Sequence, residues 1–549
     1  MAKTHKAWYS GMLSTEDWWA VWLGLTFFGL GLLTLAGIDL VGWIAYPKKW
    51  VFSLPEGAIP KKIVPVNQAF YALGSKYSLT AKEFYKSLGP IGSILVTYVV
   101  FTVATTIGAY FQKWDVKRYF IGWTFIFFTT YLVWFIGHHA FFSASVVDLK
   151  KSHFPEMFTL SLGGGASFIL ALIVGLIIGN FFKPLARYLS EAAKPEWFIK
   201  TAIVFLGVKV GYLPIKAAAS SQKLGHVLAD LTIDLFIAGA AATIVAYLIF
   251  WPGVYTIARR LFNLPRKTAA VLASAISICG VSAAVATGGA VRAKPIVSIM
   301  VSALVVVYAV IELVILPGVF THIWPGPSDP LVAGSAMGMA VKTDGADAAA
   351  GELLDEFMRA EVEKASNGAV VWPEGVITVS AVMTKIWIDM FIGLWAFILA
   401  LVWVYKIEAR EGERVPFSEV WFRFPKFVIG YFVAWFVYLG IFFGPGQGGA
   451  PEGMAVLKAA KAGAVPVEKG MRKLFFMLTF MSLGIITDFK QLHEAKFGKM
   501  VWVYFIALFL FIIPVAIIIA YLFHHGMQLP NVAGTALSYL MITLQTTFS

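Results

Sequence analysis

The amino-acid sequence predicts an all-α polytopic membrane protein with about 14 transmembrane segments. Hydrophobic residues make up 59% of the 549 residues and charged residues only 14%, whereas a soluble domain has roughly 45–50% apolar and about 25% charged residues. The mean hydropathy is +0.77. Long uncharged runs alternate with short charged segments, so we expect the chain to be surrounded by lipid.

Each apolar run of about 20 residues is long enough to cross the hydrocarbon as a helix, which satisfies its own backbone hydrogen bonds. The first run is too long for a signal peptide and is expected to remain as a helix. The segment at 331–342 is too short to span alone. The predicted segments are 18–45, 91–111, 119–147, 158–182, 197–213, 227–251, 268–290, 295–320, 331–342, 373–404, 425–443, 471–487, 500–523 and 531–548.

Several protein classes are disfavoured by composition and motifs. The basic residues behind the net charge of +13 are scattered in short clusters, so no nucleic-acid partner is expected. The single cysteine, Cys279, excludes an internal disulfide and a cysteine metal cage. The sequence has no Walker-type phosphate loop, no H-E-x-x-H motif and no Ser-His-Asp ordering. We therefore expect neither an enzyme nor an ATP-driven pump, and no cofactor beyond Na⁺ or H⁺ as a coupling ion.

Lysine and arginine in the short loops predict the orientation, because cytoplasmic loops carry an excess of both. The pattern places both termini in the cytoplasm of a bacterium, with the protein in the inner membrane. Lysine-rich outer loops near 46–90 and 444–473 weaken this bias. The predicted parts are 1–157, accessory helices with the outer loop 46–90; 158–343, a first transport repeat; 344–372, an acidic outer loop; and 373–549, a second repeat.

Internal similarity supports the two repeats. FIKTAIVFLGVKVG (198–211) is followed by a long apolar helix and NLPRKTAAVLASA (263–275), and FFMLTFMSLGIITD (475–488) is followed by another long helix and QLPNVAGTALSYL (528–540). Seven predicted helices separate the copies, so they would enter from opposite sides, as in transporters that alternate access around a central site. A chance match of Leu-Gly and Leu-Pro pairs is the alternative.

Segment 268–290, TAAVLASAISICGVSAAVATGGA, consists almost entirely of small residues. Small residues permit a helix break inside the membrane, and the amide end of a broken helix can bind an anion. A tightly packed interface helix is the alternative. The candidate substrate-binding residues here are Ser277, Cys279, Gly280, Ser282 and Thr287.

Segment 331–351 is an apolar half-helix that runs directly into ionisable groups, which are costly in a membrane and therefore suggest function. Lys342 could neutralise an anion, and Asp344 or Asp347 could bind a proton or sodium ion. The alternative is a helix end at the outer interface followed by a solvated loop. Ser335 and Thr343 complete the candidate residues of this segment.

Further charges lie inside apolar spans. Lys385 and Asp389 are four residues apart on one helix face, which favours a structural ion pair, although Lys385 is also a candidate for substrate binding. Glu312 is a candidate coupling carboxylate, or it faces a partner helix. Lys209 has no assigned role.

The run SAISICGVSAAVATGGAVRA (274–293) resembles the signature of the YeiH-type sulfate exporter family of transporters, which reads S-I-C-G-x-S-A followed by small residues. Similar motifs are VFLGVKVG, AGSAMGMAV, TKIW and MSLGIITDFKQL, so the resemblance covers about residues 160–549. It implies a fold related to sodium/proton antiporters and bile-acid symporters, with inverted repeats and broken crossing helices. Cys279, Gly280 and Ser282 would lie at the first break.

The sequence departs from this family at one point. Where the family commonly has a His-Glu pair, this chain has Gly338 and Met339, with Lys342 and Asp344 further along. Proton coupling through that pair is therefore in doubt.

The leading hypothesis is a secondary transporter that moves a small anion, such as sulfate, sulfite or an organic sulfonate or carboxylate, by alternating access. A cation/proton antiporter of similar fold is the alternative, and a non-transporting membrane sensor or scaffold, or a channel, also fits the sequence. The expected partners are the small anionic solute, the lipid bilayer and a second copy of the chain in a homodimer.

Overall fold

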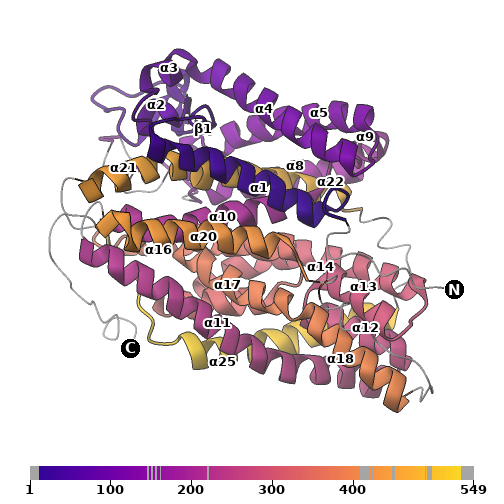
Figure 1. Cartoon of the computed structure of the whole chain (residues 1–549). Coiled ribbons are helices and arrows are strands. Elements are labelled where there is room, and N and C mark those ends of the chain that lie inside the picture. Colours follow the sequence, from indigo (N-terminus) through magenta and orange to yellow (C-terminus); the bar gives the residue numbers. More distant parts are fainter. Residues whose placement is uncertain are drawn as a thin grey trace.

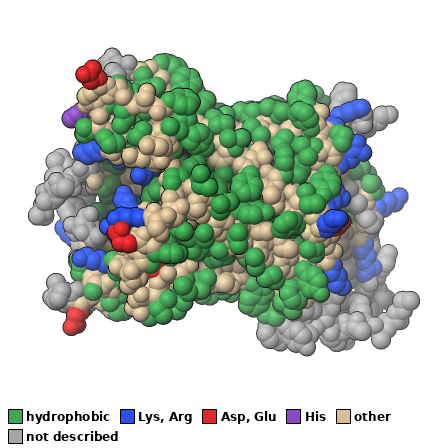
Figure 2. All heavy atoms as spheres, turned by 90° about the horizontal axis from the view of Figure 1, so that it is seen from above, with side chains coloured by type: hydrophobic (Ala, Val, Ile, Leu, Met, Phe, Trp, Pro, Cys, Tyr) green, Lys and Arg blue, Asp and Glu red, His purple; other side chains and the backbone are tan. Residues whose placement is uncertain are grey.

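The computed structural model describes residues 11–532 except 145–147, 150–151, 155–156, 161, 219–221, 408–420, 422–423, 448–451, 489 and 491–497. Its helices run mostly along one direction (Figure 1). Hydrophobic side chains cover the middle of the visible surface, and charged side chains gather at its two ends (Figure 2). A surface of this kind matches a hydrocarbon layer between two aqueous phases. The chain is a multi-pass membrane protein.

Within the described residues, 8 helices are long and apolar enough to cross a membrane, or up to 9 if one bent pair counts as a single span. This number is lower than the predicted 14 segments because several predicted segments are short, broken or folded back. The predicted segment 531–548 lies outside the described residues beyond 532.

The first layer contains the N-terminal helices and a small folded cap. The helices are α1 (Glu16–Leu32), α4 (Gly89–Phe111) and α5 (Val116–Gly137). The predicted outer loop 46–90 is a cap in which β1 (Ala45–Pro47) pairs with β4 (Phe70–Ala72) and β2 (Lys49–Val51) pairs with β3 (Ile63–Pro65). Two short helices, α2 (Gly74–Tyr77) and α3 (Lys82–Ser87), complete the cap.

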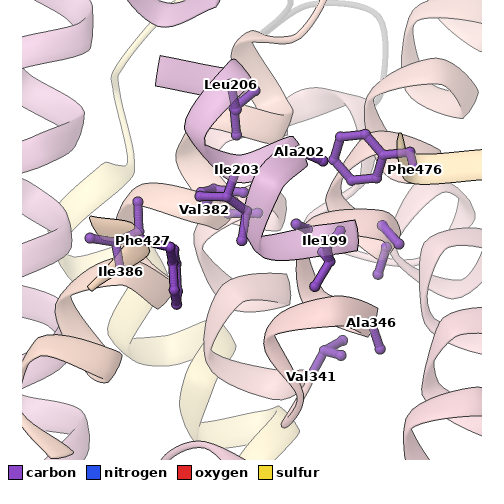
Figure 3. Close-up of a cluster of buried hydrophobic side chains, with 14 of the residues drawn as sticks. Ile199, Ala202, Ile203, Leu206, Val341, Ala346, Val382, Ile386, Phe427 and Phe476 are labelled. Atoms are coloured by element: carbon purple, nitrogen blue, oxygen red, sulfur yellow. The ribbon is translucent and has the colours of Figure 1, made fainter. Parts of the chain in front are cut away.

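The middle of the molecule is organised around a buried helix, α10. Its neighbours are close because glycine permits backbone contact: a Cβ at Gly207 would lie 2.2 Å from the Tyr431 carbonyl oxygen. Figure 3 shows Ile199, Ala202 and Ile203 of α10 among apolar side chains of other segments. The helices of this layer are α8 (Gly165–Phe181), α9 (Lys183–Leu189), α10 (Pro195–Ala218), α20 (Phe427–Phe443), α21 (Glu452–Val465), η7 (Pro466–Met471) and α22 (Arg472–Ile486).

A third group of helices lies on the other side of α10 (Figure 1). The predicted segment 373–404 forms two helices that meet at Phe391. The group comprises α11 (Gln222–Thr256), η3 (Ile257–Leu261), α14 (Pro295–His322), α17 (Val376–Met390), α18 (Ile392–Val402), η5 (Trp403–Ile407), α24 (Lys499–Phe505), η8 (Ile506–Ile512) and α25 (Ile513–His524).

The predicted break in segment 268–290 is present, between α12 (Arg266–Ser277) and α13 (Gly280–Ala290). The two arms do not form one crossing helix. The Lys267 ammonium donates to the Arg292 carbonyl oxygen at 3.2 Å, so the start of α12 lies beside the end of α13. Arms of 12 and 11 residues are roughly 16–18 Å long, about half the hydrocarbon thickness. Together they form a re-entrant hairpin.

The second predicted break is also present, between α15 (Pro330–Ala340) and α16 (Asp344–Ala365). Helix α16 starts beside the middle of α14, where Glu312 accepts a bond from Lys342 N. Helix α16 also contacts η4 (Gly326–Ser328), the short helix that precedes α15. It therefore returns toward the face from which α15 enters. The predicted crossing helices are thus two hairpins, which small residues allow to pack back on themselves.

The segment 344–372, predicted as an acidic outer loop, is largely the helix α16. An apolar face that includes Ala346, Leu353, Leu354 and Met358 is buried, which explains why the acidic sequence is helical. The inverted repeat stays a prediction, because its second copy ends beyond residue 532.

Candidate functional site

The tips of the two hairpins meet inside the molecule. The Gly280 N–H donates to the Lys342 carbonyl oxygen at 2.5 Å. A Cβ at Gly280 would lie 2.8 Å from that oxygen and 2.3 Å from Val305 Cγ1, so only glycine allows this approach. The contact joins the two segments that the sequence singled out.

Two helix N-termini start at these tips. Cys279 is the N-cap residue of α13, and Thr343 is the N-cap residue of α16, where its hydroxyl accepts a bond from Ala346 N at 3.1 Å. The amides of Val281 and Ser282 belong to the first turn of α13, where no carbonyl of the helix is available to them. Both tips therefore present the positive ends of helix dipoles.

Two lysines donate hydrogen bonds at the C-terminal ends of α12 and α15, which lead into the tips. The Lys385 ammonium donates to the Ile278 carbonyl oxygen at 3.1 Å, and the Lys342 ammonium donates to the Met339 carbonyl oxygen. Cations at a helix C-terminus neutralise its negative dipole end. These ammonium groups thus stabilise the breaks themselves.

A carboxylate lies beside each lysine: Asp389 pairs with the Lys385 ammonium, and Glu312 accepts from the Lys342 backbone. Lys385 and Asp389 form an ion pair at 3.3 Å, which confirms the predicted pairing. Glu312 accepts bonds from Lys342 N at 3.1 Å and from the Tyr504 hydroxyl at 3.3 Å. Both carboxylates are buried, so they are part of the structure that holds the tips in place.

A cavity of about 170 Å³ lies against the tips. The ammonium of Lys200, one of its lining residues, lies 2.8 Å from Asp17 Oδ1 and 3.9 Å from Glu196 Oε2. The cavity therefore combines two positive helix ends, two hydroxyls, a thiol and an ammonium with two carboxylates. Its lining residues are Glu16, Glu196, Lys200, Cys279, Val281, Ser282 and Thr343.

The structure brings part of the predicted set to this cavity. Cys279, Ser282 and Thr343 line it, and Gly280 lies at the tip contact between them. The binding roles of these residues stay predictions.

Other predicted residues lie elsewhere. The Ser335 hydroxyl is bonded to that of Thr384 at 2.9 Å between α15 and α17, and Thr287 is buried in the second half of α13. Ser277 ends α12, and Asp347 is buried in the first turn of α16. The side chain of Asp344 lies outside the described part of the structure.

Sequence reasoning missed Glu16, Glu196 and Lys200. They start α1 and α10, more than sixty residues before either hairpin, and no motif connects them to the tips. The one signal in the sequence was the charge of Lys200 near the start of the predicted segment 197–213.

A second polar region is a buried network of charges between α16, α10 and α22. Arg472 Nη1 lies 2.6 Å from Glu352 Oε2, and Arg359 Nε lies 2.7 Å from Asp355 Oδ2. The Asp355 carboxylate also accepts bonds from Gly375 N at 3.0 Å and Ile377 N at 3.1 Å, at the start of α17. The network thus connects the second hairpin to the middle layer.

Three carboxylates of this network could hold a metal ion, since oxygen atoms of Glu352, Glu356 and Glu374 all lie within 4.8 Å of one another. The Lys473 ammonium already lies 3.9, 3.0 and 2.9 Å from Oε1 of these three residues. It occupies the position that a cation would take. The three residues therefore fit an internal ion pair better than a metal site.

Comparison with known proteins agrees with a membrane protein. A family described as conserved hypothetical protein 698 matches residues 156–504. A UPF0324 membrane protein of Nitrosomonas europaea is 49% identical over 524 residues, covering 95% of this chain and 98% of the relative. A UPF0324 membrane protein of Nitratidesulfovibrio vulgaris is 27% identical over 399 residues, covering 72% of this chain and 57% of the relative. No solved structure matches.

Proposed function

Since the chain belongs to the conserved hypothetical protein 698 family, which matches residues 156–504, we propose that this multi-pass membrane protein is a secondary transporter of a small anion. The observation that carries the proposal is the cavity at the hairpin tips. There the half-helix α13 and the longer helix α16 present their amide ends to one space, together with the Lys200 ammonium. Half-helix N-termini inside a membrane are a recurrent way to bind anionic groups.

The size of the cavity points to a small substrate. Its volume of about 170 Å³ is below the roughly 300–1,000 Å³ of pockets that enclose drug-sized ligands. Sulfate, sulfite and short sulfonates or carboxylates fit this class. The Ser282 and Thr343 hydroxyls supply hydrogen bonds, and Lys200 supplies one charge.

The direction of access follows from the positions of the lining residues. Glu16, Glu196 and Lys200 lie at the starts of α1 and α10, so the cavity extends from the tips toward that end of the molecule. With the N-terminus in the cytoplasm, this is the cytoplasmic face. Alternating access then requires the tips to become accessible from the opposite face.

A cation/proton antiporter is the second candidate, and one observation favours it: two carboxylates, Glu16 and Glu196, line the same cavity. Glu312 gives it less support, because this buried carboxylate already accepts two hydrogen bonds. In the anion proposal, Glu196 is instead one of the carboxylates that balance Lys200 before the substrate binds.

The test is uptake of radiolabelled sulfate and sulfite into proteoliposomes that contain the full-length protein. Ser282→Ala is expected to raise the apparent KM about threefold to tenfold, because it removes one hydrogen bond in the cavity. Ser335→Ala is the matched control, since its hydroxyl is bonded to Thr384 outside the cavity. It should leave KM unchanged.

A different result would identify the protein as a cation transporter. If charge movement follows a sodium or proton gradient with no added anion, and Ser282→Ala has no effect, the protein is a cation transporter and the anion proposal is wrong.

A further inference from the structure

A cluster of lysines and tyrosines lies at the cap end of the molecule. It joins the cap to α21 and η7, two regions that the sequence showed only as lysine-rich loops. We name it the lysine–tyrosine cluster. Its members are Tyr46, Lys48, Tyr71, Lys76, Tyr77, Lys461 and Lys469.

Every ammonium group in the cluster lies over a tyrosine ring. Lys76 and Lys461 share the ring of Tyr77, with their nitrogen atoms 5.3 and 5.8 Å from its centroid. Lysines within about 6 Å of a ring centroid gain cation–π attraction. One lysine belongs to the cap and the other to α21, so two segments far apart in sequence place positive charge on the same ring.

The other half of the cluster repeats this arrangement. The Lys48 ammonium lies 4.7 Å from the Tyr71 centroid, and the Lys469 ammonium lies 5.1 Å from the Tyr46 centroid. The Tyr46 and Tyr71 rings themselves pack edge to face with centroids 6.4 Å apart. Four positive charges are therefore held on three aromatic rings.

None of these four ammonium groups forms a close ion pair with a described carboxylate, although Tyr46 and the more distant Glu374 raise the pKa of Lys469. In the part of the chain that the structure describes, no carboxylate lies within 4.0 Å of the ammonium groups of Lys48, Lys76, Lys461 or Lys469. Burial, with a smaller contribution from the charge of Lys76, lowers the pKa of Lys48. An anion between the lysines would relieve this repulsion.

We propose that the lysine–tyrosine cluster is a binding site for a small inorganic oxyanion of the sulfate or phosphate type. Four ammonium groups provide both the charge and the hydrogen-bond donors that such an anion needs. Helix α1 runs from Glu16, at the hairpin-tip cavity, to the cap. The cluster therefore lies at the membrane face opposite the cavity opening.

A continuous helix connects this site to the interior. Lys469 of η7 and Lys473 of α22 are four residues apart, and Lys473 pairs with Glu374 at 2.9 Å in the buried charge network. The cluster thus borders the buried charge network, in which carboxylates balance the charge of Lys473. The role of the cluster as an access site for the transported anion rests on the proposed function, but the binding itself does not.

The test is equilibrium binding of radiolabelled sulfate to the full-length protein in phosphatidylcholine nanodiscs. Ser282→Leu fills the hairpin-tip cavity and removes that site from the measurement. We expect this variant to retain sulfate binding. Lys76→Gln and Lys461→Gln, introduced together into the Ser282→Leu variant, remove both ammonium groups from the Tyr77 ring. They should weaken sulfate binding at least tenfold.

The matched control is Lys82→Gln with Lys86→Gln in the Ser282→Leu background. It removes two charges from the same cap, but these exposed lysines are not among those that lie over the cluster's rings. The Kd should change less than twofold. Folding of each variant is checked by its unfolding temperature.

Three results would overturn the proposal. Ser282→Leu protein that binds no sulfate would show that the cluster is not an anion site. Equal Kd values for the cluster variant and the lysine control would show a nonspecific charge effect. Loss of sulfate binding when phosphatidylglycerol is added would assign the cluster to a lipid headgroup instead. A protein without flux could still pass this binding test, so failure of the transport proposal is distinguishable.

Discussion

Single residues at the hairpin tips divide into those that support the breaks and those that face the cavity. Lys342 and Lys385 are among the charges that the sequence marked for substrate binding, yet their ammonium groups donate to carbonyl oxygens of the hairpin tips. Lys200, which the sequence did not mark, supplies the ammonium of the cavity. A charge in an apolar segment indicates importance, but its partner depends on packing between distant segments.

Lys200→Gln should weaken sulfate binding at least tenfold, because it removes the charge in the cavity and the ammonium that pairs with Asp17 at 2.8 Å. Charged hydrogen bonds contribute about 1.5–3 kcal/mol each. Lys200→Arg keeps the charge and should recover much of the affinity. Thermal stabilisation by sulfate, compared among the three proteins, measures this change; an unaltered shift in Lys200→Gln would remove Lys200 from the site.

At the scale of elements, the sequence located both helix breaks but not the path of the chain after them. Small residues and glycines at 274–290 and the charges after residue 340 marked the breaks correctly. A broken helix that crosses the membrane and one that folds back as a hairpin require the same small-residue composition. The choice between them depends on contacts such as Lys267 to Arg292, which the sequence alone does not contain.

Helix α16 is a second element whose path could not be predicted from its own sequence. Its many carboxylates suggested a solvated loop, but Glu352 and Asp355 are only 1% exposed and bind arginines. The alternation of acidic residues with alanine and leucine is consistent with a helix once a basic partner surface is known. Arg359 belongs to α16 itself, but Arg472 comes from α22, more than a hundred residues away.

The charge network gives a prediction for pH. Lys473 holds the pKa of the Glu374 carboxyl, in the loop before α17, well below its usual range. The carboxylate therefore stabilises the folded state fully above its ordinary pKa of about 4.3. That stabilisation is lost as the pH falls below this value.

Melting curves between pH 7 and pH 3.5 should show this loss, and Glu374→Gln should be less stable at pH 7 by about 1.5–3 kcal/mol with a weaker decline in acid. Glu83→Gln is the control, because that carboxylate pairs with Lys86 on the exposed surface. Parallel curves for Glu374→Gln and the unmodified protein would contradict the prediction.

For the whole molecule, hydropathy predicted a helical membrane protein and the approximate positions of most helices. It gave 14 segments, whereas 8 helices of the described residues, or up to 9 if one bent pair is counted, are long and apolar enough to span. Hydropathy measures apolar length and does not distinguish a complete span from a hairpin arm or a shorter buried helix. The cap at 46–90 was missed for a related reason: its strands are 3 residues each, too short for a periodic pattern.

Cys279 offers a test of access across the whole molecule. It is the chain's single cysteine and lines the cavity, so no other thiol has to be removed. A negatively charged, membrane-impermeant thiosulfonate should label it from the face where α1 begins, and millimolar sulfate should slow labelling severalfold. Cys279→Ser is the blank. Rapid labelling that sulfate does not slow would show that the Cys279 thiol does not lie at the anion site.

The meeting of the hairpin tips has a consequence for leakage. One hairpin is anchored at each membrane face, and both stop at the same depth, joined by the bond from Gly280 to Lys342. If the protein transports an anion as proposed, the solute would have to pass both tips in turn. Displacement of one hairpin would then open the centre toward one face while the other hairpin still blocked the far side. On that proposal the arrangement favours carriage of one solute at a time over a continuous aqueous pore.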